Sequence, residues 1–127
     1  MQILLAVAAG SATGGVARYL MTGALQSRTP GAFPVGTLTV NIIGSFILGA
    51  VARYAAMNPA FSPELRLLLG AGFCGGFTTF SAFSVEALEL MQLGDYSRAL
   101  GYAAISVLAA VAAAALGMAA VRALVEG

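Results

Sequence analysis

The sequence predicts an all-α membrane protein with four transmembrane helices, and three observations support this fold class. The chain has 127 residues, of which 60% are hydrophobic and 9% are charged, whereas a soluble domain usually carries about 25% charged residues. Its mean hydropathy is +0.93. The apolar residues form four runs, and each reaches the ~20 residues that a helix needs to cross a bilayer. The runs cover residues 3–25, 36–57, 65–91 and 99–124. We expect one domain over residues 1–127.

The first run contains small residues at helical spacing and one arginine. Gly10 and Gly14 are four residues apart, as are Ser11 and Gly15. Small residues at this spacing let helix backbones approach closely, so we expect this face to support association between copies of the chain. Arg18 is the only ionisable residue well inside a predicted span, and a charge in lipid is costly.

Three short connectors with turn residues separate the runs. Ser62 is placed to cap a helix that begins with Pro63. Gly94 is a predicted helix stop, and Ser97 is the predicted cap of the last helix. The connectors are residues 28–34, 58–63 and 93–98.

The second run carries polar residues on one face. Thr37, Asn41 and Ser45 recur every four residues, so they share one side of a helix. An Asn amide in lipid must be satisfied by a helix partner or by a ligand. Its NH2 group can donate to an anion or form a hydrogen bond between helices, and the sequence leaves both interpretations open.

The third run is longer than a membrane and contains weak helix formers. A continuous helix over residues 65–91 would be about 40 Å long, which exceeds the ~30 Å hydrocarbon core. Paired glycines and paired threonines predict a break near Gly75–Thr79. Irregular backbone at membrane depth must face protein or a water-filled cavity. Its freed carbonyl oxygens can ligate a hard cation such as Na⁺.

Two aromatic residues follow the predicted break. Phe80 and Phe83 are spaced i, i+3, so they lie on one helix face. The edge of an aromatic ring carries partial positive charge, so two edges along a pathway can contact a small anion. The alternative is that both rings pack against lipid or protein.

The fourth run combines hydroxyl groups with a stripe of small residues. Tyr102 and Ser106 lie one turn apart on one face, and both are hydrogen-bond donors. Together with Arg18 and the polar face of the second run, they suit an anion rather than a cation. The small residues of the stripe are Ser106, Ala109, Ala110, Ala113 and Gly117.

The acidic residues favour passive conduction over coupled transport. They lie in connectors, at the chain end or in the last two turns of the third run, and are Glu64, Glu86, Glu89, Asp95 and Glu126. We expect Glu86 and Glu89 to be interfacial; the alternative for Glu86, which lies one turn from Phe83, is a functional role. A proton-coupled transporter usually needs a titratable group in its pathway, and the chain has no histidine.

The single cysteine, Cys74, excludes an internal disulfide and a multi-cysteine metal site. A net charge of +1 gives no case for nucleic-acid binding.

The arginines are evenly divided between the two sides of a four-span topology. The side with both termini carries Arg53, Arg66 and Arg122, and the other side carries Arg28 and Arg98, plus Arg18 if it reaches outward. The positive-inside rule sets orientation by an excess of Lys and Arg in cytoplasmic loops. Because no excess exists, we predict dual topology and an antiparallel homodimer. The alternative is that Arg18 is buried, which leaves three against two.

One stretch in the third run is similar to a known family signature. GFCGGFTTFSAFS at residues 72–84 resembles the signature of the Fluc (CrcB) fluoride channels, and the second and first runs are similar to theirs in GTLTVNIIGSFILG (36–49) and GGVARY (14–19). The resemblance covers all four spans. It implies a passive, fluoride-selective channel rather than an enzyme, located in the inner membrane. It also implies a dual-topology antiparallel homodimer with two pores, whose partners are fluoride, an inverted copy and the lipid bilayer.

The resemblance also assigns site residues. It implies that backbone carbonyls of Gly75 and Thr78 hold a central Na⁺, that Phe80 and Phe83 form an aromatic box along each pore, and that Asn41 contacts fluoride. The other implied pore residues are Thr37, Ser81, Tyr102 and Ser106 in a polar track, and Arg18 near the vestibule. Two positions depart from the family pattern and lack a hydroxyl: Ala82, where Thr is usual, and Ala110, where some relatives have Ser.

Two other functions compete with a fluoride channel. A small multidrug-resistance-type, proton-coupled exporter also has four spans and dual topology. It relies on an acid in the first span, whereas the first acid here is Glu64, in a connector. A structural or assembly subunit without conduction is the third hypothesis.

Overall fold

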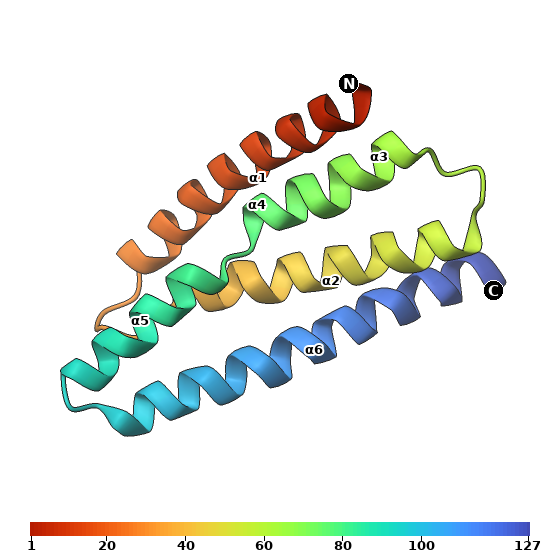
Figure 1. Cartoon of the computed structure of the whole chain (residues 1–127). Helices are drawn as coiled ribbons and strands as arrows, with labels where there is room; N and C mark the ends of the chain where they lie inside the picture. The colour runs from red at the N-terminus through yellow and green to blue at the C-terminus, as the bar shows by residue number, and fades with distance from the viewer.

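The computed structural model describes residues 1–127 and contains helices but no strands (Figure 1). Four helical spans are long and apolar enough to cross a membrane, which confirms the predicted four-span fold class. Each span extends slightly beyond the predicted apolar run. The elements are α1 (Gln2–Ser27), α2 (Val35–Met57), α3 (Pro63–Leu67), the π-helix η1 (Leu68–Cys74), α4 (Gly75–Phe77), α5 (Phe80–Gln92) and α6 (Tyr96–Glu126).

Side-chain caps fix where two of the helices begin. The Ser62 side chain accepts a hydrogen bond from the backbone N–H of Leu65, with Pro63 in the first helical position, as the sequence predicts. The prediction for α6 is wrong by two residues. Gly94 ends the preceding turn with φ +77°, and Asp95, not Ser97, caps α6 by accepting from the N–H of Arg98 at 3.2 Å.

The third span changes its packing partner at its break. The first part, formed by α3, η1 and α4, lies alongside α1, whereas α5 packs against α6 (Figure 1). The most extensive helix pair is α2 with α6. The break therefore lies between two halves that belong to different helix pairs, and α2 runs past both of them.

Three glycines on the small-residue faces of α1 and α6 pack against other helices of the same chain. A Cβ atom at Gly10 or Gly14 would collide with backbone atoms of the third span, and one at Gly117 of α6 would collide with the carbonyl of Phe46 in α2. These glycines therefore allow helices of the same chain to touch. A Cβ atom at Gly15 would have no neighbour within 4 Å, so this face of α1 is open.

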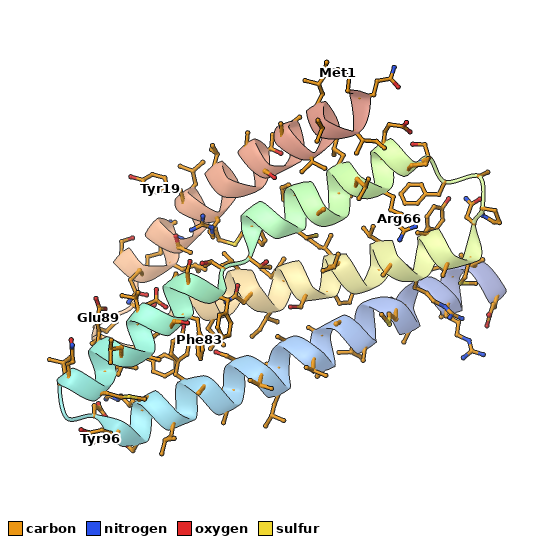
Figure 2. All side chains as sticks on the ribbon, in the orientation of Figure 1. Met1, Tyr19, Arg66, Phe83, Glu89 and Tyr96 are labelled. Carbon is orange, nitrogen blue, oxygen red and sulfur yellow. The ribbon has the colours of Figure 1, made fainter.

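Apart from Arg18 and Glu86, the charged residues lie toward the two ends of the bundle. Both termini lie at one end (Figure 1), where Glu126 forms ion pairs with Arg122 at 2.8 Å and with Arg53 at 3.8 Å. Figure 2 shows Met1 and Arg66 toward this end, and Glu89 and Tyr96 at the opposite end. Arg18 does not reach outward, because its Nε donates to the carbonyl of Gly76 in the third span at 3.0 Å. The count of arginines at the two ends is therefore three against two.

Candidate functional site

The break in the third span is formed by the two threonines. Thr78 and Thr79 have extended backbone, with φ/ψ of −91°/156° and −151°/117°. The Thr78 hydroxyl donates to the carbonyl of Cys74 at 2.8 Å, and the Thr78 N–H donates to the same oxygen at 2.9 Å. The Thr79 hydroxyl accepts from the N–H of Ala82 at 3.1 Å and caps α5. One threonine thus closes the first half-helix, and the next opens the second.

The observed break is narrower than the predicted range Gly75–Thr79, because only Thr78 and Thr79 leave the helix. Gly75 and Gly76 remain helical in α4. A Cβ atom at Gly76 would lie 2.5 Å from the carbonyl oxygen of Ser11, so the absence of a side chain there serves close packing on α1. The β-branched threonines leave the helix instead, because their hydroxyls satisfy the backbone groups that the break exposes.

Two side chains from neighbouring helices hold the break. The Nδ2 of Asn41 donates to the carbonyl of Thr79 at 3.1 Å, and the Thr79 N–H donates to the Oδ1 of Asn41 at 2.8 Å. Arg18 donates to the carbonyl of Gly76. The carbonyl oxygen of Thr78 accepts no hydrogen bond. The chain therefore satisfies the carbonyls of Gly76 and Thr79 and leaves that of Thr78 unpaired.

An aromatic and partly polar groove lies beside the break, with a volume of about 360 Å³. Phe80 is 80% exposed, and its ring centroid lies 5.4 Å from that of Phe83. The Ser106 hydroxyl is buried and has no hydrogen-bond partner. The groove brings together five of the predicted site residues with seven others. Its lining is Asn41, Gly44, Ser45, Leu48, Thr78, Thr79, Phe80, Phe83, Ser106, Val107, Ala110 and Val111.

A carboxylate that the sequence pattern predicts at the interface is part of the site. Glu86 accepts hydrogen bonds from the hydroxyl of Thr37 at 2.6 Å and from the hydroxyl of Tyr102 at 2.7 Å. The Tyr102 side chain is fully buried, and its ring centroid lies 5.0 Å from that of Phe83. Phe83 lies on the side of α5 that faces α6 (Figure 2). Thr37 and Tyr102 therefore donate to a protein group, whereas their helix positions alone suggested free donors.

Glu86 was identifiable in part from its spacing. It follows Phe83 by three residues and so shares a helix face with that ring. Its two donors are 49 and 16 residues away in the sequence, and no local pattern connects them.

Two further cavities with more polar linings adjoin the break. Their volumes are about 320 and 510 Å³, and Arg18, Thr79, Ala82 and Glu86 line both. Ser81 lines the larger one, and its hydroxyl lies 3.2 Å from that of Thr79. Five of the predicted site residues line the groove, and three others, Arg18, Thr37 and Ser81, line a cavity, whereas Tyr102 and Gly75 line none of the three. Thr79 lines the groove and both cavities.

Four apolar spans, one of them interrupted at a polar site within the bundle, define a multi-pass integral membrane protein. A profile of the family described as CrcB-like protein, Camphor Resistance (CrcB), matches residues 5–118. The chain therefore belongs to the CrcB family.

Curated relatives agree with this family assignment. A "Fluoride-specific ion channel FluC" of Caulobacter vibrioides is 48% identical over 120 residues, which cover 93% of this chain and 94% of that protein. Proteins of the same name from Geobacter sulfurreducens and Sorangium cellulosum are 44% and 42% identical. The matches cover 92% and 93% of this chain, and 91% and 93% of those proteins.

Proposed function

We propose that the protein is a passive fluoride-selective channel of the inner membrane, which lets cytoplasmic fluoride leave the cell down its electrochemical gradient. Relatives that are 42–48% identical over nearly their whole length carry the name of a fluoride-specific ion channel. The single observation in the structure that carries the proposal is the groove at the break, because it places aromatic rings beside hydrogen-bond donors inside an apolar bundle.

The groove has the chemistry that a small, strongly hydrated anion requires. A pore must replace the water around such an ion with donors, through several weak sites that allow both entry and exit. The unpartnered hydroxyl of Ser106 can donate to an anion. Asn41 uses one of its two amide hydrogens on Thr79, and the second remains for a ligand. The rings of Phe80 and Phe83 both line the groove, and their edges add weak positive potential.

The polar cavities form the approach to this groove in the proposal. Arg18 lines both cavities and uses its Nε on Gly76, so its terminal nitrogens can attract anions. Glu86 also lines both cavities and accepts hydrogen bonds from the hydroxyls of Thr37 and Tyr102. We assign Ser81, Thr37 and Tyr102 to this part of the pathway, where their hydroxyls and the carboxylate share hydrogen bonds.

The functional unit is an inverted homodimer. In one copy the groove is lined by a side chain as exposed as Phe80, and a polar groove open to lipid would leave donors unsatisfied. A second copy covers it. The arginine count differs by only one between the ends of the bundle, so both orientations insert with similar ease. Two related grooves then give two pores.

The residues at the break fit a resident Na⁺ ion. Backbone carbonyl oxygens are suitable ligands for a hard cation. Thr78 offers an unpaired carbonyl, and Gly75 lies one turn before it at an exposed position. We propose that the carbonyls of Gly75 and Thr78 from both copies hold the ion. When bound, Na⁺ supplies a fixed positive charge between the copies.

Fluoride efflux from liposomes tests the proposal. Purified protein is reconstituted into liposomes loaded with fluoride, and efflux is recorded with a fluoride electrode. We expect rapid efflux without a proton gradient and no efflux of chloride in a matched preparation. Proton-dependent export of aromatic cations would instead establish the small multidrug-resistance type of exporter. An absence of any transport would leave the structural-subunit hypothesis.

A further inference from the structure

Gly44 of α2 lines the groove and lies directly against the break. It is buried and follows Asn41 by three residues, so both face the third span. A Cβ atom at Gly44 would collide with the Cγ2 methyl of Thr78 and would lie 3.2 Å from the Cδ2 atom of Phe77. Only a glycine leaves room for the threonine methyl group at this position.

Neither neighbour can move away easily. The Thr78 hydroxyl is bonded to the carbonyl of Cys74, so rotating the side chain to withdraw its methyl group would also displace the hydroxyl. Phe77 is 3% exposed, and its ring stacks on Phe73 with centroids 5.5 Å apart and planes inclined by 14°. A side chain at position 44 would therefore be accommodated by shifting the backbone of Thr78.

We propose that Gly44 is a positioning residue for the ion site. The space left by its missing side chain receives the methyl group of Thr78 and so sets the direction of the Thr78 carbonyl, which accepts no hydrogen bond. Asn41 and Gly44 lie on the same face of α2. Asn41 holds Thr79 by two hydrogen bonds, and Gly44 holds Thr78 by close contact with its methyl group. This inference rests on the proposed Na⁺ site, but its effect on the geometry of the break does not require conduction.

The test compares Gly44→Ala with a rescue variant and a control. Gly44→Ala combined with Thr78→Ser removes the colliding methyl group and keeps the hydroxyl that bonds to Cys74. Gly101→Ala is the control, because Gly101 also lies within a long helix and has no atom within 4 Å of its Cβ position. Three quantities are measured: amide hydrogen exchange at Thr79, fluoride efflux, and the Na⁺ concentration that gives half-maximal efflux.

We expect Gly44→Ala to speed exchange at Thr79 and to slow efflux, each on the order of tenfold, since overpacking strains a close contact. It should also raise the half-maximal Na⁺ concentration, which a general loss of stability would not do. The double variant should restore Thr79 exchange, fluoride efflux and the half-maximal Na⁺ concentration to the values of the unsubstituted protein. If Gly44→Ala alone does not fold, the double variant should restore folding. Gly101→Ala should leave all three quantities unchanged. Unchanged exchange and Na⁺ dependence in Gly44→Ala, or no rescue by Thr78→Ser, would overturn the inference. If the unsubstituted protein does not conduct fluoride, the proposed function fails, and exchange at Thr79 alone decides the role of Gly44.

Discussion

Replacing Asn41 with alanine tests whether this side chain holds the broken span together. The substitution removes two hydrogen bonds to the backbone of Thr79. Hydrogen bonds between helices in membranes average ~0.6 kcal/mol and reach ~1.7 kcal/mol, so the loss of two predicts destabilisation by about 1–3 kcal/mol. Because about 1.4 kcal/mol corresponds to a factor of ten, exchange of the Thr79 amide should accelerate by roughly 5- to 150-fold.

The assay combines equilibrium unfolding in bicelles with hydrogen exchange resolved at Thr79. Ser45→Ala is the matched control, since Ser45 lies one turn further along the same face and makes no side-chain hydrogen bond. Asn41→Asp should be at least as damaging as alanine, because it sets an acceptor oxygen against the Thr79 carbonyl. The contrary result is that Asn41→Ala unfolds like the control and leaves exchange at Thr79 unchanged. In that case the two Asn41–Thr79 hydrogen bonds would not stabilise the break, and the only role left for the Asn41 side chain would be contact with the ion.

Three further perturbations separate packing from conduction. Tyr102→Phe removes a hydrogen bond to the carboxylate of Glu86 and should lower the unfolding free energy by about 1.5–3 kcal/mol, and an unchanged unfolding curve would contradict this bond. Phe80→Ile should reduce fluoride efflux with little change in unfolding, because the ring is 80% exposed in one copy, and unaltered efflux would remove the ring from the pathway. Gly10→Ala should destabilise by about 1–3 kcal/mol through overpacking against η1; Gly15→Ala, whose Cβ meets open space, should be neutral, and equal effects of the two would refute the close-packing argument.

The four spans and the existence of the break were predictable because both are local properties of the sequence. Span length depends on the number of consecutive apolar residues, and the paired glycines and threonines of the third run mark the weak point of its helix. Length alone does not predict a break, since α6 runs through 31 residues without one. The choice of the residues that leave the helix, in contrast, depends on contacts with residues that are distant in the sequence. Gly76 stays helical because it packs against Ser11 of α1, and Thr79 leaves because Asn41 of α2 accepts from and donates to its backbone. Both partners lie in other helices.

The polar part of the site was only partly predictable for a similar reason. Helical spacing placed the hydroxyl groups on the correct helix faces, but it could not show that Thr37 and Tyr102 converge on Glu86. The packing of α2 and α6 on α5 determines this convergence. The π-helix η1 was likewise not predicted, since it lies where the third span packs closely on the glycines of α1.

The interruption of the third span provides both signs of partial charge within one turn of chain. The end of α4 exposes carbonyl oxygens, which carry partial negative charge, and the start of α5 exposes N–H groups, which carry partial positive charge. Arg18 and Asn41 donate to the carbonyls of Gly76 and Thr79, whereas the carbonyl of Thr78 accepts no hydrogen bond and keeps its partial negative charge available. Phe80 is the first residue of α5, and its exposed ring therefore lies at the positive end of that helix. The proposed cation position at Thr78 and the proposed anion position beside Phe80 are thus favoured by the same break. Because α2 holds this break by two hydrogen bonds and a close contact, a shift of the break by one residue would move both proposed positions together.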